Sequence, residues 1–225
     1  MEAALISLIA ASVTFVGTHF ALSHPLRAPL VRVLGQGGFM LLYSLVAVAA
    51  IWWMAVAFRA VQTGQLGGSG TAGWIVATIL TLPAMVLLVG SLAGNPALPA
   101  PGAEKQARQE PRGVFAVTRH PMMWGFALWA AAHIALWWSW RTNIVALAIL
   151  VLALVGAHLQ DRKKRALMGK AWEEWQAKTS YWPRWSALPS VGWKPWLAGA
   201  FVWLAATYGH IHAAGIPAGV WRWLA

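Results

Sequence analysis

Residues 142–165 read TNIVALAILVLALVGAHLQDRKKR, an apolar run that ends in a cluster of basic residues. A run of about 20 apolar residues is the length that an α-helix needs to cross the hydrocarbon core of a bilayer. Five other stretches share this character, so the predicted membrane spans are 3–22, 37–59, 72–93, 120–140, 142–159 and 196–213. The sequence therefore predicts an all-α protein, a single polytopic membrane helix bundle over residues 1–225 with about six transmembrane helices.

The composition is that of a membrane protein. Hydrophobic residues make up 59% of the chain and charged residues only 10%. Soluble domains carry roughly 25% charged residues. The chain has no cysteine, which excludes disulfides, thiol catalysis, iron–sulfur clusters and zinc sites built on thiolates. Any bound metal would need histidine, carboxylate, methionine or tyrosine ligands.

The basic residues predict an orientation in the membrane. The chain has 17 Lys and Arg residues against 6 Asp and Glu residues. If the N-terminus lies outside, two, four and eight basic residues fall in the three inner loops, and only Arg59, Arg141 and Arg222 fall outside. Because inner loops retain Lys and Arg, this distribution predicts an N-out/C-out topology. The basic excess is thereby explained without a nucleic-acid partner, and the lipid bilayer is the partner expected.

Two inner segments have features of their own. Residues 160–178 are predicted to form a cytoplasmic amphipathic helix with Leu167, Ala171, Trp172 and Trp175 on one side. Its basic face would lie on anionic lipid, or else the segment is a solvated charged run that closes the inner face. The proline-rich segment 94–118 is either an ordered turn or a mobile loop. Most of the 17 Trp residues lie near predicted span ends, as expected for aromatic belts.

Two histidines lie inside predicted spans that are otherwise uncharged, His19 in the first and His133 in the fourth. Ionisable residues within a membrane are costly and usually face a cavity, a partner or a cofactor. All six carboxylates lie outside the spans, which disfavours a carboxylate proton relay or a hard-metal site. Neutral imidazoles on different helices suit the axial ligation of haem iron. The alternative is an ordinary hydrogen-bonded histidine in the core.

The surroundings of His133 suit a flat ligand. At helical spacing, Met122, Gly125, Phe126, Trp129 and His133 form one stripe. Gly125 would let a planar macrocycle approach the backbone, and Phe126 and Trp129 would offer stacking faces. Core packing between helices with a hydrogen-bonded histidine explains the same stripe, and the spacing alone favours it.

Several motifs occur in one order along the chain. They are Gly17-Thr18-His19, then Thr118-Arg119-His120-Pro121 with Trp124-Gly125, Leu128-Trp129 with His133, Asp161-Arg162, Gly169-Lys170-Ala171-Trp172 and Lys178-Thr179-Ser180. This ordered set resembles the NnrU family, which is related to the 15-cis-zeta-carotene isomerase of plants and cyanobacteria. The resemblance covers nearly the whole chain and is weakest in residues 60–115 and after 190.

The resemblance implies a multi-pass protein of the bacterial inner membrane that holds haem b between His19 and His133. In the isomerase, reduction of the haem releases one ligand and lets the iron act on a cis double bond of a polyene. NnrU members of proteobacteria are associated instead with denitrification and nitric oxide. The isomerase has a cysteine three residues before the second ligand, where this chain has Ala130, so a thiol switch is excluded.

Helix geometry leaves the ligand pair open. His133 lies about 20 Å along its helix from His120, which is predicted at the inner interface, whereas His19 lies about 6 Å from the inner end of its own helix. The pairs His19 with His120 and His133 with His210 match better in depth. Arg119 and His120 are themselves candidates to hold haem propionates, although Pro121 would also simply start a helix here.

Two other functions remain open. An S-adenosylmethionine-dependent membrane methyltransferase of the isoprenylcysteine methyltransferase type has a similar Arg-His-Pro turn followed by an acidic inner helix, for which Glu173 and Glu174 are candidates. The basic run after Asp161 departs from that pattern. A non-enzymatic membrane assembly factor is the other alternative. The substrate itself has no readable signature, because an apolar groove leaves no polar code.

Overall fold

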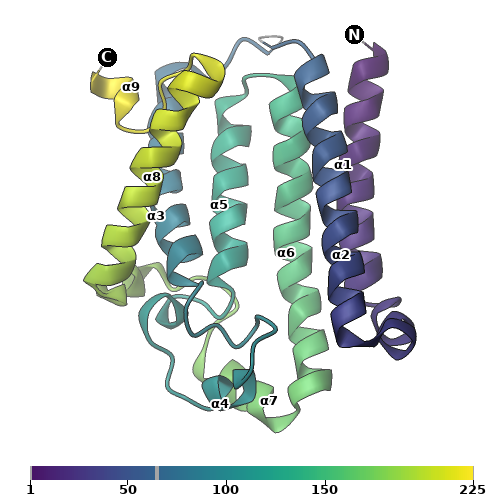
Figure 1. The fold of residues 1–225 in the computed structure, drawn as a ribbon. Coiled ribbons are helices and arrows are strands. Elements are labelled where there is room, and N and C mark those ends of the chain that lie inside the picture. The colour runs from purple at the N-terminus through teal and green to yellow at the C-terminus, as the bar shows by residue number, and fades with distance from the viewer. Residues whose placement is uncertain (1, 64–65, 225) are drawn as a thin grey trace.

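The computed structural model describes residues 2–63 and 66–224, which form helices and connecting turns without a strand (Figure 1). The long helices are α1 (Glu2–Ser23), α2 (Arg27–Ala60), α3 (Gly70–Gly90), α5 (Pro121–Leu136), α6 (Trp140–Met168) and α8 (Trp193–Ala214). The short elements are α4 (Ala103–Ala107), η1 (Gly113–Ala116), α7 (Lys170–Lys178), η2 (Trp185–Val191) and α9 (Trp221–Leu224). The predicted all-α fold is confirmed.

Each of the predicted spans falls on one of the long helices, but they are not equally suited to cross a bilayer. Within the described residues, four helices are both long and apolar enough, namely α1, α2, α3 and α6. Helix α5 is apolar but has only 16 residues, about 24 Å of helix. Helix α8 runs beside α3 (Figure 1) and has 22 residues. Both chain ends lie at the same end of the bundle (Figure 1). The N-out orientation stays a prediction.

Helix α2 begins earlier than the span predicted from residue 37. Its first part is separated from the rest by Gly35, which has φ 69° and ψ 171° and is not helical. A positive φ of this kind is easily adopted only by glycine. The kink therefore sets apart the first turns of α2 from the longer apolar helix that follows.

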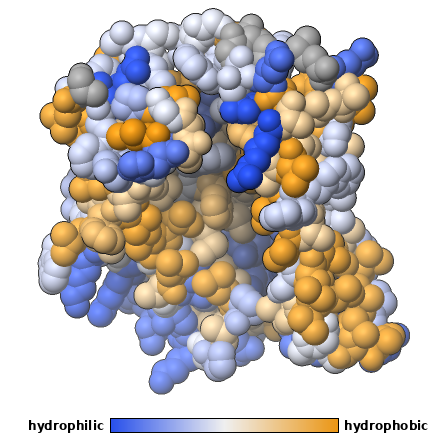
Figure 2. Space-filling view, turned by 45° about the horizontal axis from the view of Figure 1, so that its top comes forward, coloured by the Kyte–Doolittle hydropathy of each residue, from blue (hydrophilic) through white to orange (hydrophobic). Residues whose placement is uncertain are grey.

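The long helices form two groups. One consists of α1, α2 and α6, the other of α3, α5 and α8, and the two meet where α5 packs on α6. Figure 2 shows a furrow between two lobes of the surface, with an apolar band between more hydrophilic upper and lower ends. Close packing in the second group depends on glycine: a Cβ on Gly199 would lie 2.7 Å from the Cα of Val86. Small residues let membrane helices approach closely, and Gly199 serves this purpose between α8 and α3.

We call the end of the bundle that carries α4 and α7 the basic end. There the prediction of one amphipathic helix over 160–178 is wrong, because α6 continues to Met168 and a break at Gly169 precedes α7. The apolar face of α7 does not meet lipid: Trp172 and Trp175 are fully buried in a protein core with η1 and the end of α3. Leu167, predicted on the same side, is exposed. The break at Gly169 turns α7 back onto the bundle and buries its indoles.

The proline-rich segment 94–118 is ordered. Of the two alternatives, an ordered turn and a mobile loop, the structure shows the first. The Asn95 side chain accepts a hydrogen bond from the backbone N–H of Ala97 at 2.9 Å. The ammonium of Lys164 donates to the carbonyl oxygens of Pro96 at 3.0 Å and Leu98 at 3.4 Å. A buried basic side chain of α6 thus holds this segment against the basic end.

Candidate functional site

An apolar cavity of about 680 Å³ lies between the two helix groups. Its wall is formed by residues of α1, α2, α3, α5 and α6, including Phe15, Tyr43, Met54, Leu88, Phe126 and Leu152. Ligand sites in proteins usually have volumes of roughly 300–1,000 Å³ and predominantly apolar walls with a few polar groups. The cavity has this size and character, and it is the first candidate site.

His19 lines this cavity from α1. Its Nδ1 lies 2.7 Å from the carbonyl oxygen of Phe15, one turn earlier. Because a carbonyl can only accept, Nδ1 carries the proton and Nε2 keeps a free lone pair. The rings of Phe15 and Tyr43, with centroids 4.3 Å and 5.5 Å from the imidazole, restrict its orientation. A histidine that donates its second N–H to a backbone carbonyl is the usual arrangement of a metal ligand.

Three further residues predicted for the site line the same cavity, Gly125, Phe126 and Trp129 of α5. Gly125 also has a packing role, because a Cβ there would lie 2.8 Å from the carbonyl oxygen of Ala84 on α3. The close approach of α5 to α3 thus already requires glycine at this position, whatever occupies the cavity.

His133 is placed differently. It is not among the cavity-lining residues in the described part of the chain. Its Nδ1 lies 2.8 Å from the carbonyl oxygen of Trp129, and its ring packs on the indole of Trp129 with centroids 4.2 Å apart. On its other side lies His210 of α8, with ring centroids 6.4 Å apart. The structure therefore brings His133 next to His210, whereas His19 lines the cavity.

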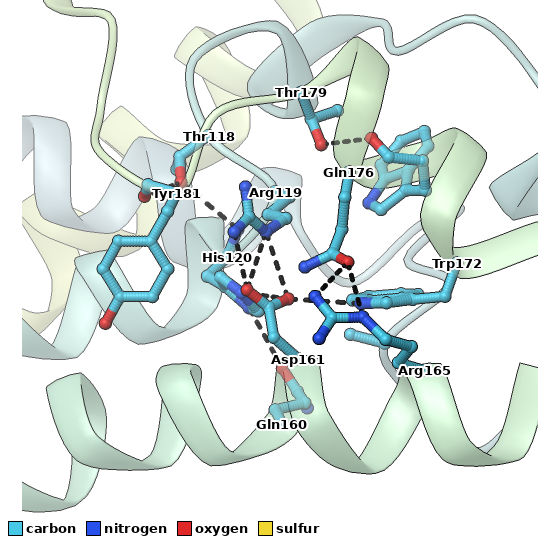
Figure 3. Close-up of polar contacts among 12 residues, drawn as sticks. Thr118, Arg119, His120, Gln160, Asp161, Arg165, Trp172, Gln176, Thr179 and Tyr181 are labelled. Carbon is cyan, nitrogen blue, oxygen red and sulfur yellow. Dashed lines mark hydrogen bonds and ion pairs between the residues drawn. The ribbon is translucent and has the colours of Figure 1, made fainter. Parts of the chain in front are cut away.

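Arg119 and His120 form a second, polar cluster with Asp161 of α6 (Figure 3). The guanidinium binds the carboxylate through two nitrogens: Nε lies 3.0 Å and 2.9 Å from the two oxygens, and Nη2 lies 2.6 Å from Oδ2. Nε2 of His120 donates to Oδ1 at 3.0 Å. The side chains of Arg119, His120 and Asp161 are 12%, 0% and 9% exposed. The carboxylate held by the Arg-His-Pro turn in this structure is thus one of the chain's own.

Neighbouring residues hold the cluster in place. The indole N–H of Trp172 donates to Oδ1 of Asp161 at 3.3 Å, from the buried face of α7. The hydroxyl of Thr118 donates to the carbonyl oxygen of Tyr181 at 2.8 Å, and this ties the turn to the segment after α7. The Tyr181 ring lies beside Arg119 and His120, and burial and the nearby Asp161 raise the pKa of its phenol. The cluster therefore joins α5, α6, α7 and the segment that follows.

The sequence pattern placed Asp161 near the start of the predicted amphipathic helix over 160–178 and gave it no role beside the Arg-His-Pro turn. The apolar run of α6 ends at Leu159, and the sequence predicted a separate helix after it, whereas α6 continues without a break to Met168. One signal was available: Asp161 is the only acid between Glu110 and Glu173, and it stands beside four basic residues. A lone carboxylate in such a segment is a natural partner for a buried guanidinium.

Beside this cluster lies an open pocket of about 640 Å³, whose wall combines charged side chains with apolar and aromatic ones. It is lined by residues of the cluster and by neighbouring polar and aromatic side chains, including His158, Arg162, Arg165, Gln176 and Trp182. The pocket is distinct from the apolar cavity, because the two share no lining residue.

Within the residues that the structure describes, no group of three or more histidine or acidic side chains is arranged to hold a metal ion. A haem iron would need fewer protein ligands, because the macrocycle would supply four nitrogens and the chain only one or two axial ligands. His19, with its pinned Nδ1 and its place in an apolar cavity, fits that requirement.

Comparison with known proteins identifies one family. The family model for NnrU protein matches residues 7–218. No curated protein and no solved structure matches the chain. Because the match extends over nearly the whole length, the chain belongs to the NnrU family.

Proposed function

We propose that this chain is a membrane protein that binds haem b in the apolar cavity, with His19 as an axial ligand of the iron. The observation that carries the proposal is the His19 imidazole, which lines a cavity of about 680 Å³ while its Nδ1 is bound to the Phe15 carbonyl. Phe126 and Trp129 supply aromatic surface for a macrocycle in the same cavity. The predominantly apolar wall would exclude water from the bound group.

His133 is the second ligand that the resemblance implies. Its imidazole packs on Trp129, which itself lines the cavity, so Trp129 connects His133 to the cavity wall. His210 is the alternative partner for His133, and its Nδ1 is likewise bound to the carbonyl of the preceding turn, Ala206, at 2.8 Å. The choice between these residues is one outcome of the test below.

A bound haem would supply an iron that changes its oxidation state and its affinity for axial ligands. We further propose that this serves either the redox-gated cis–trans isomerisation of a polyene or a role linked to denitrification and nitric oxide, in the bacterial inner membrane. The protein's own part is to orient the His19 lone pair, to hold an apolar ligand among Phe126, Trp129 and their neighbours, and to keep water out.

The test is the optical spectrum of the purified protein with haem supplied. The wild-type protein should show a Soret band that shifts on reduction, and His19→Ala should lose most of it. The matched control is His212→Ala, which removes an exposed histidine of α8 and should leave the spectrum unchanged. If His133→Ala alters the reduced spectrum and His210→Ala does not, His133 is the second ligand. A wild-type protein without a Soret band would refute the proposal, as would a His19→Ala variant that binds haem equally well.

A second candidate is the membrane methyltransferase. It is favoured by the open pocket of about 640 Å³ beside the Arg-His-Pro turn, on the side of Asp161 and Gln176. Calorimetric titration with S-adenosylhomocysteine distinguishes the two functions. Saturable binding that Gln176→Ala weakens would support the methyltransferase, and absence of heat would exclude it.

A further inference from the structure

The apolar cavity has one polar end. Its polar lining residues other than His19 and Tyr43 are Ser23 and His24 at the end of α1, and Gln160 and Lys163 in the last turns of α6. These parts of α1 and α6 point toward the basic end of the bundle (Figure 1). The rest of the wall is apolar or aromatic. The cavity is therefore amphipathic along its length.

In the part of the chain that the structure describes, Lys163 forms no ion pair. Three of the chain's six acids have partners elsewhere. Asp161 binds Arg119 and His120, Glu110 pairs with Lys178, and Glu174 pairs with Arg108. Among the described residues, no hydrogen bond or ion pair is formed by the Lys163 ammonium. The next residue differs, because Lys164 donates to two backbone carbonyls. The charge of Lys163 therefore remains available to a ligand in the cavity.

Other basic groups lie near Lys163 at this end of the cavity. The pKa of His24 is lowered by its burial and by repulsion from Lys163 and Arg162. Arg27, at the start of α2, is also close enough to interact with Lys163. Several positive charges thus act on the polar end of the cavity, and they favour an anion there.

We propose that the cavity binds an amphipathic carboxylate, with its anionic group paired with Lys163 and its apolar body between α1, α5 and α6. For haem, which carries two propionates, this inference rests on the proposed function; for other carboxylates it is independent of it. Lys163 lines the apolar cavity itself. Arg119 and His120 already bind Asp161; Arg119 lines the other pocket, and His120 lines neither of the two. Lys163 is therefore the anchoring residue, in place of the Arg-His-Pro turn.

The experiment compares each acid with its neutral ester in the intact protein. The probes are haem and haem dimethyl ester, followed by absorbance, and cis-parinaric acid and its methyl ester, followed by fluorescence. The wild-type protein should bind each acid about tenfold or more tightly than its ester. This difference in affinity is the one expected from a single charge-assisted hydrogen bond between Lys163 and the carboxylate. Lys163→Met should lose this preference and leave ester binding unchanged, and Lys163→Arg should restore it. The matched control is Lys105→Met, which removes one charge from exposed helix α4 at the same end.

The outcomes separate this inference from the proposed function. If haem does not bind but parinaric acid is preferred through Lys163, haem binding is refuted and the carboxylate site stands. If haem and its ester bind equally in both the wild type and Lys163→Met, the carboxylate site is refuted and haem binding stands. A phospholipid headgroup is the other anion that Lys163 could bind. Measurements in nanodiscs with and without phosphatidylglycerol test this alternative. If this lipid abolishes the acid preference, the site holds a phospholipid headgroup and the proposal is overturned.

Discussion

Asp161 accepts hydrogen bonds from three side chains, those of the neighbouring residues Arg119 and His120 and that of Trp172 on α7. A buried carboxylate is stable only when its charge is paired and its oxygens are hydrogen-bonded. Arg119 supplies the charge and the two-nitrogen geometry that a carboxylate prefers. The carboxyl group of Asp161 is thus a central partner where the start of α5 meets α6, together with the His120–Gln160 contact at 3.2 Å.

Asp161→Asn should destabilise the protein strongly. The substitution leaves the Arg119 guanidinium buried without a counter-ion, and breaking a buried pair in this way costs about 3–5 kcal/mol. The matched control is Glu174→Gln, which breaks an exposed ion pair. The side chain of Arg108 in this pair is 52% exposed, and that of Glu174 is 44% exposed. Exposed pairs contribute about 1 kcal/mol or less. Thermal unfolding in detergent measures both. Equal midpoints for the two variants would contradict the role given to Asp161.

At the scale of elements, glycines decide how closely the helices of the second group approach. Gly199 of α8 lies against the backbone of Val86, whereas a Cβ on Gly209, ten residues further along the same helix, would meet no atom within 4 Å. The two positions share a helix and a residue type but differ in their surroundings. They therefore separate the effect of helix packing from that of helix propensity.

Gly199→Ala should destabilise the bundle by about 1–3 kcal/mol, because the added methyl overpacks the contact between α8 and α3. Gly209→Ala should be neutral or stabilising by up to about 1 kcal/mol, since alanine is the better helix former. The measurement is the unfolding midpoint of each variant in the same detergent. A loss of stability in Gly209→Ala as large as that in Gly199→Ala would show that the close contact is not the cause.

At the scale of the whole molecule, the arrangement of charge gives the bundle a direction. The long basic loops, α4 and α7 lie at one end, and both chain ends lie at the other (Figure 1). The distribution of Lys and Arg predicts that the basic end is cytoplasmic. Because the chain has no cysteine, introduced cysteines can be labelled without background.

In intact cells, a membrane-impermeant maleimide should label Ala213→Cys, at the end of α8, but should label Gln109→Cys only after the membrane is permeabilised. Both positions are exposed, so access is decided by the side of the membrane alone. The opposite pattern would show that the chain ends are cytoplasmic, and labelling of both positions in intact cells would contradict a simple two-sided bundle.

The sequence predicted the helices well and their packing poorly. The apolar runs placed each long helix to within a few residues at most ends, because the need to satisfy backbone hydrogen bonds in lipid leaves helix as the only choice. The same runs could not show that Gly169 ends α6, or that the apolar face of α7 packs on protein. Lipid and protein core are both apolar, so a stripe of indoles at helical spacing does not distinguish between them.

For the candidate site, the sequence identified side chains and the tertiary structure assigned them to places. His19, Gly125, Phe126 and Trp129 line one cavity, as expected of residues in a common site. The sequence by itself determined that the protein is a helical membrane bundle with His19 and His133 in apolar surroundings, because hydropathy and charge are properties of each segment alone. Only the tertiary structure decided that His133 faces His210, that Arg119 and His120 bind Asp161 and that Lys163 reaches the cavity, because these contacts depend on which helices pack together.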